Sequence, residues 1–166
     1  MVTEAPPPQD RHRYFYFEQV ARGDSLFLET IKVLFPEEVA AFETVKQIRA
    51  EKSYFLERLQ EEGYYMTHAL HTPLPGKTAA ARSRIYRDAL PNLIQEILRV
   101  ATPRSPIVIV SAVVYRAVGS SLKASGFNVL QDDVIAYPNS GQQLNFRRKF
   151  KPLLQENYLL PDKIMM

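Results

Sequence analysis

The chain has 166 residues, of which 46% are hydrophobic, enough to form the core of one folded domain and too many for a disordered protein. It has no cysteine, which excludes disulfides, zinc–thiolate sites and iron–sulfur clusters. No apolar run approaches the roughly 20 residues that span a bilayer, and no signal-peptide pattern opens the chain. We therefore expect a cytoplasmic protein with no membrane partner.

Charge is distributed unevenly along the chain. Residues 1–62 hold 12 acidic and 8 basic residues, whereas residues 63–166 hold 6 acidic and 13 basic residues. Positive charge in the C-terminal two thirds indicates an anionic partner, with nucleic acid as the first candidate. The alternative is a solvated surface on which the aliphatic stems of Arg and Lys cover the edges of the core.

The first 62 residues are predicted to be mostly helical. Residues 1–11 contain the run Pro6-Pro7-Pro8, and we expect them to form a flexible arm. Three amphipathic helices are expected between residues 24 and 62. Asp24 or Ser25 suits the start of the first helix, Pro36 the first turn of the second, and Gly63 the end of the third.

Strands and helices are predicted to alternate over residues 63–155. The expected strands are 63–70, 106–110 and 127–136, and the expected helices are 82–101, 113–125 and a basic helix from residue 144. Within 82–101, Pro91 indicates that the regular helix begins near Asp88 or kinks there. This alternation is typical of a parallel sheet with right-handed crossovers. We therefore expect residues 12–166 to form a single α/β domain, with a helical part at 24–62 and a strand–helix core at 63–155.

The polar loop before the basic helix is the first candidate for a ligand site. Asn139-Ser140-Gly141 interrupts the extended pattern, and a helix rich in cations follows. A strand, a polar turn and a basic helix present backbone N–H groups and positive charge to a phosphate. The alternative is an ordinary turn with a helix cap. The candidate substrate- and nucleic-acid-binding residues of the whole chain are Thr67, Pro138, Asn139, Ser140, Gln142, Arg147, Arg148 and Lys149.

Two further patterns invite a ligand. His68 and His71 lie at an odd spacing on an expected strand, which puts them on opposite faces, so we expect neither a metal site nor a cofactor. Gly76-Lys77-Thr78 is similar to the end of a phosphate-binding P-loop, which indicates a nucleotide-binding hydrolase as one alternative. The motif also needs a glycine where His71 stands, so a simple turn is the other interpretation.

Residues 60–155 resemble the uracil-DNA glycosylase superfamily in the order and spacing of their segments. The segment Tyr64–Pro73 takes the place of a strand that ends in a Thr-Asn or similar pair, and Thr67 matches that Thr. The segment Tyr137–Ser140 takes the place of the His-Pro-Ser-Pro type of loop that enters DNA. The resemblance implies a three-layer sandwich with a short, mainly parallel central sheet, here preceded by extra helices.

The same resemblance implies DNA or nucleobase binding and base excision, with His68 and Tyr137 as the catalytic candidates. His68 stands where the family has the Asn that reads the uracil edge, and Tyr137 where it has the His that stabilises the departing uracil anion.

In the family, a Gly-x-Asp-Pro-Tyr or Gly-Glu-Ala-Pro loop after the first strand positions the attacking water. We find no such loop, and Asp24 and Asp88 are suitable carboxylates by chemical type alone. The alternative to a glycosylase is a non-catalytic interaction module of the same fold that has lost this loop.

Overall fold

The chain forms two compact units, each built from two separate stretches of sequence. The structure is a computed structural model and describes residues 1–8, 15–74 and 76–161. The first unit comprises Met1–Asp10 and Met66–Tyr137, and the second comprises Arg11–Tyr65 and Pro138–Met166. Each unit thus combines distant parts of the chain, and the single domain expected over residues 12–166 stays a prediction.

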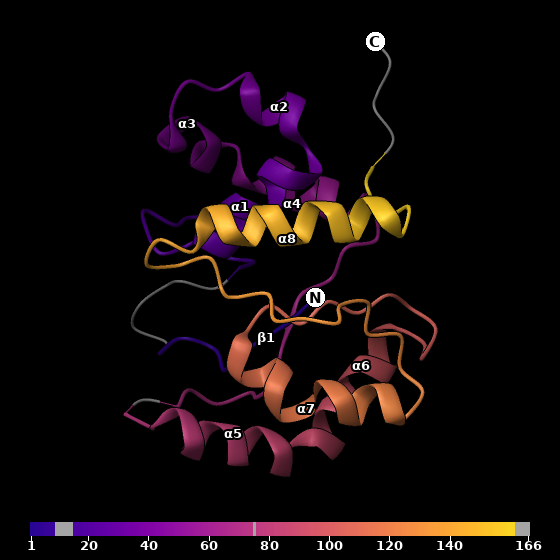
Figure 1. Ribbon diagram of the computed structural model, residues 1–166. Coiled ribbons are helices and arrows are strands. Elements are labelled where there is room, and N and C mark those ends of the chain that lie inside the picture. The colour runs from indigo at the N-terminus through magenta and orange to yellow at the C-terminus, as the bar shows by residue number, and fades with distance from the viewer. Residues whose placement is uncertain (9–14, 75, 162–166) are drawn as a thin grey trace. The chain divides into compact units, whose positions relative to one another are not determined.

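A small parallel sheet organises the first unit (Figure 1). Strand β1 (Val2–Thr3) pairs with β2 (Thr67–His68), with Val2 opposite Thr67 and Thr3 opposite His68. Further parallel bridges join neighbouring segments at Val2–Ile109, Ile107–Val129 and Val110–Ile135. The spatial order is therefore residues 67–68, 2–3, 107–110 and 129–135, which makes β1 an inner strand of the sheet.

The inner strand β1 lies where the sequence predicted a flexible arm. Val2 and Thr3 are buried, and the N–H of Val2 donates to the carbonyl of Val108 at 2.8 Å. The carbonyl of Val2 accepts from the N–H of Val110 at 2.7 Å. A two-residue strand is too short to show the alternation by which strands are recognised in a sequence. The prediction therefore rested on the proline run that follows it. Residues 9–11 of the predicted arm lie outside the described residues.

Three helices complete the first unit, namely α5 (Ala79–Asp88), α6 (Leu90–Val100) and α7 (Ala112–Ala124). The predicted helix over residues 82–101 is two helices that meet at Ala89, because Pro91 fits the first turn of α6 and has no N–H for a continuing helix. Helix α5 packs against α7. The apolar core of this unit comprises Val2, Ala69, Tyr86, Leu93, Ile97, Ile107, Ile109, Val114, Ala117, Val118, Leu122, Phe127 and Val129.

The regular secondary structure described in the second unit consists of helices joined by turns and loops. It contains α1 (Ser25–Leu34), α2 (Pro36–Ala40), α3 (Val45–Ala50), α4 (Lys52–Glu61) and α8 (Gln143–Glu156). Where the sequence predicted one helix after Pro36, the structure has two, because Thr44 and Gln47 form a capping box that begins α3. Helix α8 packs against α1, and two of its own side chains, Phe146 and Phe150, are fully buried with their rings stacked 4.9 Å apart.

These elements confirm the broad α/β class, with a small parallel sheet and many helices. Among the residues that the structure describes, no helix combines the length and the apolar character needed to cross a membrane.

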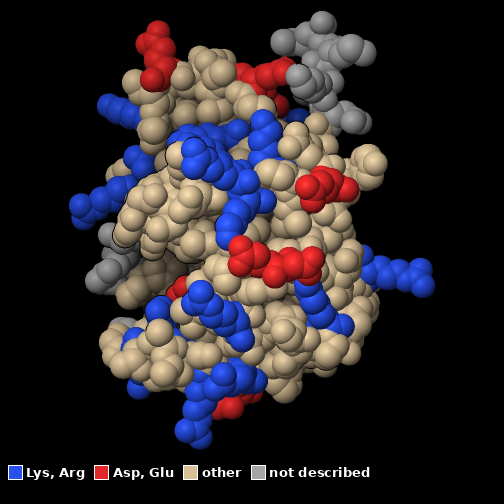
Figure 2. Space-filling model, viewed as in Figure 1, with Lys and Arg blue, Asp and Glu red and all other residues tan. Residues whose placement is uncertain are grey.

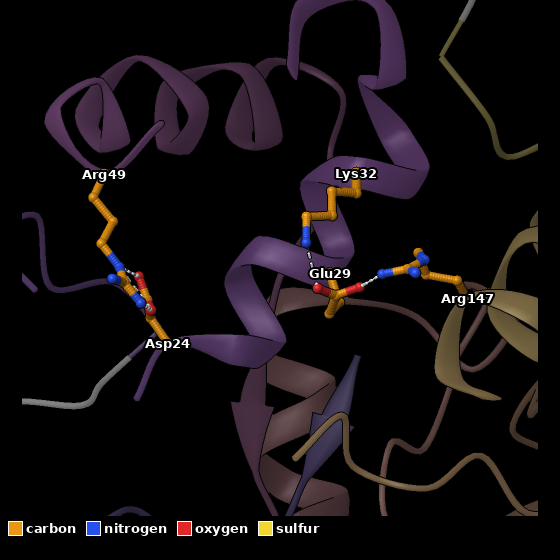
Figure 3. A network of polar contacts seen from close by, with 5 residues as sticks. All are labelled: Asp24, Glu29, Lys32, Arg49 and Arg147. Atoms are coloured by element: carbon orange, nitrogen blue, oxygen red, sulfur yellow. Dashed lines mark hydrogen bonds and ion pairs between the residues drawn. The ribbon is translucent and has the colours of Figure 1, made fainter. Parts of the chain in front are cut away.

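Helix α4 places a lysine ammonium inside the second unit. Lys52 is 1% exposed, its Nζ makes no hydrogen bond, and it lies 4.5 Å from the centroid of the Phe27 ring. Nearby, the carboxylate of Asp24 accepts hydrogen bonds from Nε and Nη2 of Arg49 (Figure 3). Burial lowers the pKa of Lys52 to about 8, although the charge of Asp24 acts in the opposite direction.

Lys52 should make stability depend on pH. Its pKa is lower in the folded state than the 10.5 of an ordinary lysine, so the unfolded chain binds more protons between about pH 8 and 10.5. The free energy of unfolding should therefore rise by about 2 kcal/mol from pH 7 to pH 10 on this account. Urea unfolding should show this rise in the wild type and in Lys46→Met, an exposed control, and lose it in Lys52→Met. A rise of equal size in Lys52→Met would contradict the assignment.

Candidate functional site

Polar groups at the carboxyl end of the sheet converge on Glu4, the residue directly after β1. Its Oε1 accepts a hydrogen bond from Oγ of Ser111 at 2.8 Å, and its Oε2 accepts one from Nη1 of Arg82 at 2.9 Å. Ser111 directly follows the strand segment 107–110, and Arg82 comes from α5. Parallel strands end at the same edge of a sheet, which brings together residues that are 107 positions apart in sequence.

The Glu4 carboxylate is open to water. The side chains of Glu4 and Arg82 are each 30% exposed. A carboxylate oxygen can accept two hydrogen bonds, and each oxygen of Glu4 accepts one from the side chains named above. Acceptor capacity therefore remains for a water molecule or a substrate group at this edge of the sheet.

Hydrogen bonds to Tyr86 and Ala69 hold the backbone around Glu4. The N–H of Ala5 donates to the hydroxyl of Tyr86 at 3.2 Å. The N–H of Ala69 donates to the carbonyls of Thr3 at 2.8 Å and Glu4 at 3.2 Å. Burial, followed by the negative charge of Glu4, raises the pKa of Tyr86, so its hydroxyl stays protonated at neutral pH. The carboxylate is thus carried by an ordered loop.

His68, predicted as catalytic, lies beside this loop at the end of β2. Both ring nitrogens are covered by the protein. Burial lowers the pKa of His68, a hydrogen bond with the Glu4 backbone raises it, and the charge of His71 lowers it further. The net shift is downward, so the imidazole is neutral at pH 7. Thr67, one residue earlier, is partly buried and donates its N–H to the carbonyl of Met1 at 3.0 Å.

The remaining predicted residues divide between the two units. Tyr137 is partly buried at the end of the first unit, whereas Pro138 and the residues after it belong to the second. Asn139 and Ser140 are exposed, and Ser140 has a left-handed backbone with a φ of 45°. The N–H of Gln142 donates to the carbonyl of Asn139 at 2.8 Å, closing a turn directly before α8. The predicted turn is confirmed, and its role in ligand binding stays a prediction.

Helix α8 uses its first arginine inside the second unit. Arg147 forms an ion pair with Glu29 of α1, a carboxylate that is 4% exposed and also accepts from Nζ of Lys32 at 2.6 Å (Figure 3). Arg148 and Lys149 are exposed. Figure 2 shows Lys and Arg gathered over the region of α8. Of the three predicted cations, Arg147 is therefore committed to helix packing, while Arg148 and Lys149 are placed at the surface.

The P-loop-like pattern is a turn and a helix cap. Gly76 has a φ of +67°, and Oγ1 of Thr78 accepts from the N–H of Ala81 at the start of α5. Of the two carboxylates considered for water activation, Asp24 is buried and paired with Arg49, and Asp88 is exposed at the end of α5. Within residues 1–8, 15–74 and 76–161, no group of three or more acidic, histidine or cysteine side chains is arranged to hold a metal ion.

Sequence reasoning did not identify Glu4, although a signal was present. The segment Thr3-Glu4-Ala5-Pro6 has the Glu-Ala-Pro of the Gly-Glu-Ala-Pro loop, with Thr3 in the place of the glycine. We sought that loop next to the strand expected at 63–70, whereas the structure has an earlier strand, β1, that ends at Thr3. Ser111 had no sequence signal of its own, and nothing in the sequence connected Arg82 with Glu4, because only the folded sheet brings the three residues together.

Comparisons with protein-family models, curated proteins and solved structures give no match to this chain. Functional inference therefore rests on the residues that the structure brings together, of which Glu4, Arg82 and Ser111 form the most specific group.

The downward shift of the His68 pKa is open to direct measurement. We expect the His68 ring to titrate below the 6.5 of an ordinary histidine, because burial disfavours the charged imidazolium. The corresponding stability is present above pH 6.5 and is lost as the pH falls, since the unfolded chain then binds the extra proton. NMR titration of the ring resonances, with His68→Asn to assign them, provides the midpoint. A midpoint at or above 6.5 would show that the ring is not shielded as described.

Arg147 should matter for stability and Arg148 should not. Replacing Arg147 by Met leaves the buried Glu29 with Lys32 alone, and we expect the free energy of unfolding to fall by about 2 kcal/mol. This figure is below the full value for a buried pair because the Arg147 side chain is 36% exposed. Arg148→Met, the control, should change it by less than about 0.5 kcal/mol. Equal effects in urea unfolding at pH 7 would remove the distinction.

Proposed function

We propose that the protein hydrolyses the N-glycosidic bond of a nucleobase in DNA, with Glu4 as the residue that orients the attacking water. The observation that carries this proposal is the partly exposed Glu4 carboxylate at the end of an inner parallel strand, held by Arg82 and Ser111. Cleavage of such a bond needs a water held on the far face of the sugar and support for the charge that develops on the base.

The order of segments supports the resemblance to uracil-DNA glycosylases. A Glu-Ala-Pro sequence follows the first strand, as in the Gly-Glu-Ala-Pro loop of that family, and the paired strand β2 ends in Thr67-His68. We propose that the parallel sheet and its helices are a reduced form of the family's three-layer sandwich. Thr3, in place of the loop glycine, is the one departure within this motif.

The other residues take separate roles in this proposal. His68, with a neutral ring and both ring nitrogens buried beside the Glu4 backbone, supports the loop that carries the carboxylate. Tyr137 stacks on the flipped base or donates a hydrogen bond to it. Asn139 and Ser140 bind phosphate, and Arg148 and Lys149 supply the salt-dependent attraction to DNA that is independent of sequence.

The alternative, a non-catalytic module, assumes that the fold has lost the carboxylate that activates water. Glu4 is a suitable carboxylate, and its presence favours the hydrolase over the non-catalytic module. Support for a nucleotide-binding hydrolase falls, because the hydroxyl of Thr78 is engaged as the cap of α5.

A single-turnover excision assay tests the proposal. The substrates are single- and double-stranded oligonucleotides that contain uracil or hypoxanthine, and an oligonucleotide with an abasic site, which is the product of the reaction, serves as the binding control. We expect base release by the wild type and a rate that is at least about 100-fold lower in Glu4→Gln, because the amide keeps the shape and loses the charge. Glu18→Gln, at an exposed glutamate, is the control and should keep the wild-type rate.

Two outcomes would overturn the proposal. The first is equal rates in the wild type and Glu4→Gln. The second is no base release from any substrate, and salt-sensitive binding without release would favour the non-catalytic module.

A further inference from the structure

Ser111 connects the Glu4 carboxylate to the start of α7. Its Oγ accepts from the N–H of Val114 at 3.2 Å, as the N-cap of the helix, and donates to Oε1 of Glu4 at 2.8 Å. A serine hydroxyl has one proton. The N–H of Val114 is itself a donor, so that single proton points to Glu4. Ser111 is fully buried, which keeps water from replacing either bond.

Arg82 donates a hydrogen bond to the other oxygen of the Glu4 carboxylate. Its Nη1 donates to Oε2 of Glu4 at 2.9 Å, and a guanidinium has no acceptor to offer in return. Both oxygens of Glu4 therefore receive protons from donors, which is the pattern of an ionised carboxylate. Arg82 lies one helical turn before Tyr86, whose hydroxyl accepts from the N–H of Ala5, so the same face of α5 holds the side chain and the backbone of the loop.

We infer that Ser111 and Arg82 are positioning residues, which hold the Glu4 carboxylate in one orientation. This inference rests on the proposed function only where it concerns rate, because the position of the carboxylate can be determined without any substrate.

The variants are chosen to separate this role from helix capping. Ser111→Gly removes the donor to Glu4, and glycine at an N-cap costs a helix little compared with serine. Arg82→Met removes the other donor and keeps the aliphatic stem. Thr78→Gly is the matched control, because it removes a capping hydroxyl from α5 that has no bond to Glu4.

The first measurement is the crystal structure of each variant, compared with that of the wild type. We expect the Glu4 carboxylate to leave its wild-type position in Ser111→Gly and in Arg82→Met, because each change removes the donor that holds one of its oxygens. Thr78→Gly should leave the carboxylate in place. A carboxylate that keeps its position in both of the first two variants would overturn the inference, whatever the activity of the protein. If one variant fails to fold, the other decides.

The second measurement is the rate of single-turnover base release. The rate should fall by about tenfold in each variant and should be restored in Ser111→Thr, which returns the hydroxyl donor. An unchanged rate alongside a displaced carboxylate would overturn the positioning role. A displaced carboxylate in a protein whose wild type releases no base would instead overturn the proposed function and leave the role of the two donors established.

Discussion

The parallel pairing of β1 on both of its sides is the constraint on which the first unit depends. Val2 shares a ladder with Thr67 on one side and a bridge with Ile109 on the other, so two residues connect segments that are far apart in sequence. A strand this short has few hydrogen bonds of its own, and its stability comes from burial between two neighbours. Because β1 is held in this way, the residue that follows it, Glu4, is delivered to the edge where the other strands also end.

Buried and partly buried carboxylates determine which basic residues are paired within the protein. Arg82, Arg147 and Arg148 are indistinguishable as sequence letters. Arg147 lies against the buried Glu29, Arg82 lies against Glu4 at the strand ends, and Arg148 faces solvent. Removing a carboxylate from water is costly without a partner, so each buried acid commits a cation to it. The net positive charge of the C-terminal part therefore overstates the charge that remains for an anionic partner.

The sequence predicted long, periodic elements better than short ones. The helices after residue 63 were predicted well, because the apolar residues of α6 and α7 repeat at helical spacing. Of the expected strands, 63–70 is reduced to the two residues of β2, and 106–110 and 127–136 contribute only isolated parallel bridges. The sequence pattern did not reveal β1, whose two residues have no period. The site followed the same rule: the strand end at Thr67-His68 was found from pattern, whereas Glu4 and Ser111 meet only through a pairing that adjacent residues do not encode.

The state of Glu4 bears on the kind of chemistry that it can perform. A carboxylate that already accepts two hydrogen bonds, one of them from a guanidinium, is better suited to orienting a water than to removing its proton. Cleavage of a glycosidic bond passes through a transition state with positive charge on the sugar, and the water adds late to that cation. Such a reaction gains more from a fixed negative charge than from a strong base, because the charge stabilises the cation directly. The neutral imidazole of His68 fits the same requirement, since a second positive charge beside Glu4 would weaken that field.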